Sequence, residues 1–241
     1  MIVLQAMDAA GKDGTIKHVF ARLNPAAVHV HSFKQPSTEE KEHDYMWRVN
    51  KALPSRGEIG IFNRSHYEDV VIARIHNLIE SDGLPEELIS DGIWKKRYRQ
   101  ICDWEKYLTE NGFPVIKIFL HVSKAEQKKA PHRPHRDQAE ELESFSMPIS
   151  KNGSTGTAIR RCTAKVISAT TKNYAPWYVV PADNKWYTRY VVAQIVLKSL
   201  REINPDFPKL SAEVESQLEQ FRKILKNIDI EDLKSIKESM K

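Results

Sequence analysis

Cysteine is nearly absent from this sequence, since its 241 residues include only Cys102 and Cys162. Two cysteines provide neither a disulfide framework nor the ligand spacing of a structural metal site. No window of about 18 apolar residues occurs, which excludes a membrane-spanning helix of the usual length. A charged leader with a small-residue cleavage site is also absent from the start, so we predict no signal peptide. These absences favour a protein of the reducing cytoplasm.

The length suits one α/β domain with a full core. The formal net charge is +5 and the isoelectric point is about 9.0, which suggests a polyanionic partner. A basic protein with no such partner has the same charge, so that alternative stays open. The first predicted strand begins at Met1. Because most domains have some lead-in there, we expect that an N-terminal piece is missing.

The stretch AMDAAGKDGT, residues 6–15, follows an apolar run and leads into a segment with helical spacing. A strand, a small-residue turn and a helix start form the layout of a phosphate-binding loop. Small residues let backbone N–H groups surround phosphate oxygens, and Lys12 can reach the transferring phosphate. Asp13-Gly14 stands where Ser or Thr usually holds magnesium, so Asp8 becomes the natural metal ligand. The predicted phosphate-binding residues are Ala9, Ala10, Gly11, Lys12, Asp13, Gly14 and Thr15. The alternative is an ordinary glycine-containing turn before a helix.

A second polar cluster, Asn63 to Glu68, follows the predicted strand 58–62. In open α/β sheets ligands bind beyond the carboxyl ends of the strands, so this cluster and the phosphate loop should share one rim. Arg64 can neutralise phosphate, Asn63 can accept from metal-bound water, and Glu68 can hold a metal or orient a nucleotide. Turn and cap chemistry is the alternative for Asn63, and a surface ion pair is the alternative for Arg64.

The remaining pattern alternates strands and helices. We predict further strands at 28–33, 113–122 and 177–181, and helices at 15–23, 38–53, 70–80, within 85–112, at 186–202, and one or two within 208–241. Residues 130–165 show neither a helical nor a strand period and contain PHRPHR and SKNGSTGT, which read as linker.

The strings AMDAAGKDGTIKHV, SFKQPS, GIFNRSHYEDV, IFLHVSKAEQKK and NYAPWYVVPADNKWYTRYVVA closely resemble the polyphosphate kinase 2 family. This resemblance implies a three-layer α/β/α phosphate-loop NTPase-like fold with a parallel five-stranded sheet. It also implies Mg²⁺, with Mn²⁺ as a substitute, and phosphoryl transfer between inorganic polyphosphate and an adenine or guanine nucleotide. By the family pattern, Asp8, Lys12 and Arg64 are catalytic-site residues. The FNRSHYE form resembles the branch that acts on AMP as well as ADP.

A basic track for the polyphosphate chain is the expected companion of that chemistry. Lys34, Lys185 and Arg189 stand near predicted strand ends and would line it together with Arg64, while Asn63 and Glu68 would bind the nucleotide. We expect one kinase domain over 1–241 with a helical tail at 206–241. We further expect a homo-oligomer with no nucleic-acid or membrane partner.

The family pattern also includes a helical lid, with strings like KNWKF, ADIKER and YWDDY, where residues 130–165 lie. None of these strings appears here. Codons for residues 141–145, read in a shifted frame with one base removed, give Asn-Trp-Lys-Phe, and the following residues permit the other strings in family order. We infer that this segment is translated out of frame, with the frame restored near Val166.

The aberrant segment should therefore be largely irregular. Prolines and glycines within it oppose helix formation, and its basic residues Arg133, Arg136, Arg160 and Arg161 would not be held in place. We expect a folded protein that still binds polyanions but turns over slowly. Two other functions remain open: a phosphate-loop kinase that uses ATP to phosphorylate a small molecule, and a non-enzymatic module that binds polyphosphate or nucleic acid.

Overall fold

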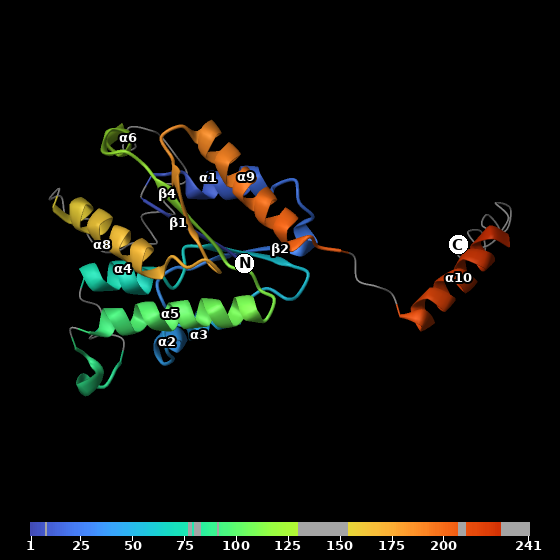
Figure 1. Cartoon of the computed structure of the whole chain (residues 1–241), viewed down its shortest axis with the longest axis horizontal. Helices are drawn as coiled ribbons and strands as arrows, with labels where there is room; N and C mark the ends of the chain where they lie inside the picture. Colours follow the sequence, from blue (N-terminus) through green and yellow to red (C-terminus); the bar gives the residue numbers. More distant parts are fainter. Residues whose placement is uncertain are drawn as a thin grey trace, which may run out of the picture. The chain divides into compact units, whose positions relative to one another are not determined.

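Five parallel strands form a single sheet with helices on both faces (Figure 1). The computed structural model describes residues 1–7, 9–76, 79, 83–90, 92–129, 154–206 and 211–227, without the side chains of 128–129, 154–156 and 226–227. The strands are β1 (Ile2–Ala6), β2 (Val28–Ser32), β3 (Ile59–Asn63), β4 (Ile116–His121) and β5 (Trp177–Pro181). This arrangement confirms the predicted α/β class and the parallel five-stranded sheet.

The strand order is β2-β3-β1-β4-β5, so β1 lies at the centre. Ile2, Val3 and Leu4 are at most 3% exposed, as expected for an apolar strand that is covered on both faces. Leu4 is paired with Asn63, and Asn63 is paired with Ser32 on β2. The carboxyl ends of β1, β2 and β3 therefore meet at one edge of the sheet.

The helices of the first part of the chain are α1 (Lys12–Phe20), α2 (Thr38–Lys41), α3 (Trp47–Lys51), α4 (Glu68–Ile75), α5 (Ile93–Glu110), α6 (Lys124–Lys129), α8 (Ser154–Thr170) and α9 (Lys185–Ile203), with short 3-10 turns at Pro25–Ala27 and Glu86–Leu88. A further helix, α10 (Ala212–Asn227), follows in the tail. Figure 1 shows α1 and α9 together on one face of the sheet and α4, α5 and α8 on the other. A buried hydrophobic cluster joins Val3 and Phe62 of the sheet to Val70, Ile101 and Val166 of the second layer.

The single helix predicted at 38–53 is wrong, because the structure has two short helices there. Ser37 forms the expected cap: its hydroxyl accepts from the Glu40 N–H, and the Glu40 carboxylate accepts from the Ser37 N–H. The helix stops after one turn, and the Asp44 carboxylate accepts from the Met46 N–H at 2.8 Å. This local side-chain bond offers the backbone an alternative to continuing the helix.

The expectation that residues 130–165 lack regular structure is wrong for the last part of that segment. Helix α8 begins at Ser154, ahead of Val166, and its buried residues include Cys162, Val166 and Thr170, which lie four positions apart, besides Thr163. They pack against α4 and α5. Cysteine and threonine carry this stripe in place of the usual aliphatic residues, which hid the helical period. The earlier residues, including Arg133 and Arg136, lie outside the described residues.

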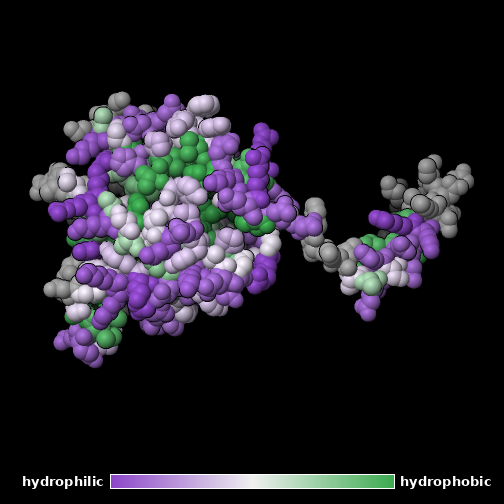
Figure 2. Space-filling view, in the orientation of Figure 1, coloured by the Kyte–Doolittle hydropathy of each residue, from purple (hydrophilic) through white to green (hydrophobic). Residues whose placement is uncertain are grey.

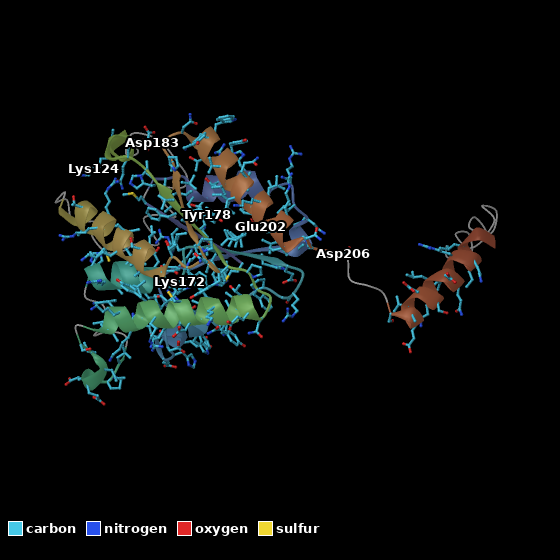
Figure 3. All side chains as sticks on the ribbon, in the orientation of Figure 1. Lys124, Lys172, Tyr178, Asp183, Glu202 and Asp206 are labelled. Atoms are coloured by element: carbon cyan, nitrogen blue, oxygen red, sulfur yellow. The ribbon has the colours of Figure 1, made fainter. Side chains whose placement is uncertain are left out.

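Arg160 also differs from expectation, because α8 holds its guanidinium in place. Its Nη1 donates to the Val122 carbonyl at 3.2 Å, and its Nη2 donates to the Gln127 side chain at 3.0 Å. These bonds tie α8 to the end of β4 and to α6. Asp183, at the end of β5, accepts from the Ser123 N–H at 2.7 Å and lies near Lys124 at the same edge (Figure 3).

Two compact units divide the chain, Met1–Ser199 and Leu200–Lys241. The first contains the whole sheet. In the view of Figure 2 its surface is largely hydrophilic, with apolar residues gathered toward the β5 edge, where Val179 is 56% exposed. The described part of the second unit is the last turn of α9 together with α10. No described helix has the length and apolar content needed to cross a membrane.

Candidate active site at the carboxyl edge of the sheet

The phosphate loop connects β1 to α1 with two residues in the left-handed backbone region, Ala9 at φ 64° and Gly11 at φ 77°. Helix α1 begins directly after Gly11, whose carbonyl accepts from both the N–H and the hydroxyl of Thr15 at 3.0 Å. The first N–H groups of α1 have no partner within the helix and lie next to the loop, where the helix dipole adds positive potential. This combination is a ready anion site.

Lys12, Asp13 and Asn63 form a hydrogen-bonded group at this rim. The Lys12 ammonium contacts the Asn63 side-chain oxygen and lies 3.7 Å from the Asp13 carboxylate. The Asn63 amide donates to Asp13 at 2.7 Å and to the Ser32 hydroxyl at 3.1 Å. The rim therefore joins the ends of β1, β2 and β3, as the strand-end argument predicted. The Lys12 side chain keeps 14% exposure, so its ammonium is held but accessible.

Arg64 follows Asn63 with φ 65°, a backbone conformation that non-glycine residues rarely adopt. Its N–H donates to the Leu4 carbonyl at 3.1 Å, which fixes the turn against β1. Strained residues persist only where their surroundings hold them, and they concentrate at functional sites. The next three residues, Ser65, His66 and Tyr67, are at most 2% exposed and anchor the turn in the core.

Two cations of α9 approach the loop from the neighbouring element. A Cβ atom at Gly14 would lie 3.5 Å from Arg189 Nη2, and one at Gly11 would lie 3.8 Å from Lys185 Cε. Arg189 Nε is buried and has no hydrogen-bond partner among the described residues. A buried guanidinium N–H without an acceptor is costly, and a bound phosphate oxygen would satisfy it. Lys34, by contrast, has an exposed side chain.

A pocket of about 450 Å³ opens between the α2–α3 segment and α5. Two buried arginines dominate its wall. Arg97 donates to the Asp69 carbonyl at 2.9 Å and stacks over the Tyr45 ring at 4.5 Å. Arg48 donates to the Lys34 carbonyl at 2.9 Å and lies 3.4 Å from the Asp69 carboxylate. Arg48 therefore links the pocket to the end of β2. The lining also includes Pro36, Glu40, Lys41, His43, Asp44, Met46, Leu84, Leu88, Ile93, Lys96 and Gln100.

Burial raises the pKa of the Tyr45 hydroxyl well above its usual value, an effect that the Arg97 charge opposes. The hydroxyl is thus protonated at neutral pH and donates to the Gln100 side chain at 3.0 Å. With the stacked rings of His43 and Trp47 nearby, 4.0 Å apart, this wall combines flat apolar surface with fixed cations. Such a combination suits a planar base that carries phosphates.

Sequence comparisons assign this arrangement to a known family. A family profile described as "Polyphosphate kinase 2" matches residues 1–208. The chain belongs to the polyphosphate kinase 2 family. It is 38% identical over 227 residues to an ADP-polyphosphate phosphotransferase of Rhodopseudomonas palustris, covering 93% of this chain and 78% of the relative. It is 39% identical over 209 residues to an AMP/ADP-polyphosphate phosphotransferase of Meiothermus ruber, covering 87% and 74%.

A solved structure of the family has the same fold. The crystal structure of polyphosphate kinase 2 from Arthrobacter aurescens TC1 superposes with a TM-score of 0.70 at 34% sequence identity, covering 90% of this chain and 74% of that one. The predicted three-layer phosphate-loop fold is therefore confirmed, together with the family resemblance on which it was based.

Within this family fold, the predicted site residues separate into three groups. The rim contains the loop residues Ala9 to Thr15 together with Asn63 and Arg64, and the α9 cations lie against it. Asn63 and Glu68, predicted to bind nucleotide, are absent from the lining of the pocket; Glu68 begins α4 and is half-buried. Asp8, the predicted metal ligand, lies outside the described residues.

Sequence reasoning missed the pocket arginines, Arg48 and Arg97. Arg97 lies four residues after Ile93 and four before Ile101, both of which are buried, so the helical period places it on the inner face of α5. An arginine at such a position was the available signal. The signal for Arg48 was weaker, because this residue lies in the predicted helix 38–53, which the structure divides into two short helices.

Proposed function

We propose that this chain transfers a phosphoryl group between inorganic polyphosphate and an adenine nucleotide, converting AMP to ADP and ADP to ATP. The observation that carries the proposal is the presence of a phosphate loop with cations around it and of a separate pocket that holds two buried arginines. The names of the relatives support the same pair of substrates.

Polyphosphate would lie along the rim. Backbone N–H groups at the start of α1 would bind its terminal phosphate, and Lys12 would neutralise the charge that develops during transfer. Arg64, Lys185 and Arg189 would hold the following phosphates, with Lys34 at the outer end. A polyanion with about one charge for each phosphate needs several such cations, which accounts for the basic composition.

The nucleotide would occupy the pocket. Arg48 and Arg97 are fixed before the ligand arrives, since Asp69 and backbone carbonyls already orient them. The base would stack among the aromatic rings, and the terminal phosphate would face the rim through the side of the pocket that Arg48 forms. In the transfer, an oxygen of that phosphate bonds to the terminal phosphorus of polyphosphate while the bond to the shortened chain breaks.

We also propose Mg²⁺ as the cofactor, with Mn²⁺ able to replace it. The donor set fits this hard ion, because the rim offers the Asp13 carboxylate, the Ser32 hydroxyl and the Asn63 amide oxygen. No cluster of three or more His, Cys, Asp or Glu side chains occurs among the described residues. Mg²⁺ does not require one, because substrate phosphates and water usually complete its shell. When bound, the ion neutralises phosphate charge.

The described structure adds one element to the lid argument. Helix α8 includes the last residues of the segment 130–165, and its Arg160 is fixed to the end of β4. The family lid strings are missing from the sequence. We propose that turnover is lower than in a chain with the family lid restored. We retain the expectation of a cytoplasmic protein, which two buried free thiols favour, and that of a homo-oligomer.

The direct test is incubation with long-chain polyphosphate, Mg²⁺ and either ADP or AMP, with ATP or ADP as the measured product. A parallel reaction supplies AMP with ATP as the only donor and measures ADP, because transfer from ATP to ADP would give no net product. We expect product only when polyphosphate is present. Equal product from ATP alone would favour the small-molecule kinase, and salt-sensitive polyphosphate binding without product would favour the binding module.

A metal titration tests the Asp8 assignment. We expect Asp8→Asn to require a higher Mg²⁺ concentration for half-maximal turnover, because one charged ligand is lost. Asp183→Asn, a carboxylate at the end of β5, is the control. An unchanged titration in Asp8→Asn would remove Asp8 from the proposed metal site.

A further inference from the structure

A buried polar network lies directly behind the rim. Lys117 on β4 donates to the Glu105 carboxylate at 2.5 Å, to the Thr170 carbonyl at 2.9 Å and to the Tyr67 hydroxyl at 3.2 Å. Tyr67 in turn donates to the second Glu105 oxygen at 2.8 Å. Lys117, Glu105 and Thr170 are 0% exposed and Tyr67 is 2% exposed. Every polar hydrogen of the ammonium and of the phenol therefore has an acceptor.

Burying such a network in the core costs desolvation free energy, because charged and polar groups are removed from water. Burial raises the pKa of the Glu105 carboxyl, and the neighbouring Lys117 ammonium opposes that shift. Apolar residues of similar volume often stabilise a protein as well as a buried ion pair does, or better. Pairs of this kind do, however, fix one arrangement of the groups that they join. The groups joined here therefore indicate what the network does.

Two of those groups lead to functional parts of the molecule. Tyr67 ends the turn that carries Arg64, and the Tyr67 N–H donates to the Ser65 hydroxyl at 3.2 Å. Thr170 is the last residue of α8, the helix that begins within the segment 130–165, and its hydroxyl accepts from Trp177 of β5 at 2.9 Å. The network thus joins the rim turn to the C-terminal end of α8.

We propose that Tyr67, Glu105 and Lys117 are positioning residues for Arg64. Their network holds the Asn63–Tyr67 turn so that Arg64 keeps its left-handed backbone and presents its guanidinium to the rim, and the same bonds fix the end of α8. None of the three lines the pocket or belongs to the phosphate loop. This inference rests on the proposed transfer function.

The test is Tyr67→Phe in the full chain, which removes a single hydroxyl. We expect kcat for polyphosphate-dependent transfer to fall about 10-fold, because the turn loses its anchor, while KM for ADP stays within about two-fold, because the pocket is untouched. Thr109→Val is the matched control, since its hydroxyl bonds only backbone carbonyls on and near the same helix.

A second variant separates positioning from stability. In Glu105→Gln the amide still gives Tyr67 a hydrogen-bond partner but leaves the Lys117 charge unpaired. We expect this variant to have the lower melting temperature of the two and yet the higher kcat. If kcat follows melting temperature across all three variants, the network is merely structural and the proposal is overturned. Absence of transfer in the unmodified chain would instead refute the proposed function itself.

Helix α10 carries a second, independent inference. Val214, Leu218, Phe221 and Leu225 follow each other at intervals of four, three and four residues, and each is at least 41% exposed. Figure 2 shows apolar residues among the charged ones on this helix. This spacing is typical of the apolar seam of a helix pair, and Glu215 and Arg222 lie at its flank.

We propose that α10 pairs antiparallel with α10 of a second copy of this chain. In that register Val214 faces Leu225 of the second copy and Leu218 faces Phe221 of the second copy. The helix pair then contains two Val214–Leu225 layers and two Leu218–Phe221 layers. Glu215 then lies near Arg222 of the second copy at both ends, whereas parallel pairing would place uncharged Gln217 there. The 16 residues span only about 24 Å, so the association should be weak and concentration-dependent.

Charge exchange tests both the partner and the direction. Sedimentation of the full chain over a range of concentrations should give a dimer dissociation constant that Glu215→Arg alone and Arg222→Glu alone each raise about five-fold. The double variant should recover, and Glu213→Arg, which lies off the seam, should change little. Phe221→Ser should abolish the association. A monomer at all concentrations, or a double variant that does not recover, would contradict the proposal.

Discussion

The rim and the pocket both present cations to phosphate, but they are built in opposite ways. Lys12, Asn63 and Arg64 come from two short motifs at strand ends, and the Lys12 ammonium remains accessible. Arg48 and Arg97 come from different helices, are at most 8% exposed, and are held by Asp69 and backbone carbonyls. Accessible cations suit a long polyanion that must slide after each transfer, and fixed ones suit a compact nucleotide.

The largest expected effect lies at the rim. Lys12→Ala should lower turnover about 10³-fold or more, because transition-state cations matter on that scale in phosphoryl transfer. The fold should survive, since Lys12 projects into the rim and not into the core. Lys17→Ala, an exposed lysine on the same helix, is the control. Initial rates with polyphosphate and ADP give the comparison, and a rate near that of the unmodified chain would exclude Lys12 from catalysis.

Restoring the lid should have the next largest effect. A chain in which residues 130–165 are replaced by the sequence of the shifted frame should turn over about 10²-fold faster, because closure excludes water and adds cations around the transferring phosphoryl group. KM for the nucleotide should change less than kcat, since the pocket is already formed. Equal kcat values in the two chains would show that the rim suffices without the family lid.

At the pocket we expect a change in binding more than in rate. Arg97→Lys keeps the charge but loses the planar group that bonds Asp69 and stacks over Tyr45, so KM for ADP should rise about 10-fold. Turnover at saturating ADP should fall much less. Arg99→Lys, an exposed arginine on the same helix, is the control. If Arg97→Lys leaves KM unchanged, the nucleotide does not bind in this pocket.

The same contrast explains what the sequence could predict. The phosphate loop and the Asn63–Glu68 cluster are contiguous, so their chemistry was visible in the residue types and their rim position followed from parallel strands. The pocket brings together side chains that are far apart in the chain. It also depends on a break in the predicted helix near Asp44, which no residue propensity indicated. Helix α8 was missed because Cys162 and Thr170 supply its buried face, and Ala130–Lys165 was read as irregular from its prolines and glycines.

A last effect, on stability and not on turnover, concerns pH and the turn behind the rim. His66 is fully buried, neither ring nitrogen has a partner among the described residues, and burial lowers its pKa to about 3. In the unfolded chain His66 therefore takes up a proton as the pH falls through the usual histidine pKa of about 6.5. In the folded chain it stays neutral at that pH. Stability from this residue is full above about pH 6.5 and is lost as pH falls toward 3.

His66→Phe should remove that acid dependence. Urea unfolding between pH 7 and pH 4 should show the unmodified chain losing about 3 kcal/mol more than the variant, at about 1.4 kcal/mol for each pH unit. His18→Gln, an exposed histidine on α1, serves as the control. Identical slopes in the chain and in His66→Phe would mean that His66 becomes protonated without unfolding the turn.

The most direct test of the two-site account is a crossed binding measurement. Titration calorimetry with polyphosphate and, separately, with ADP is carried out on the unmodified chain, on Lys12→Ala and on Arg97→Lys. The account predicts that Lys12→Ala weakens polyphosphate binding while ADP affinity is kept, and that Arg97→Lys weakens ADP binding while polyphosphate affinity is kept. Loss of the same ligand in both variants would contradict the assignment of polyphosphate to the rim and the nucleotide to the pocket.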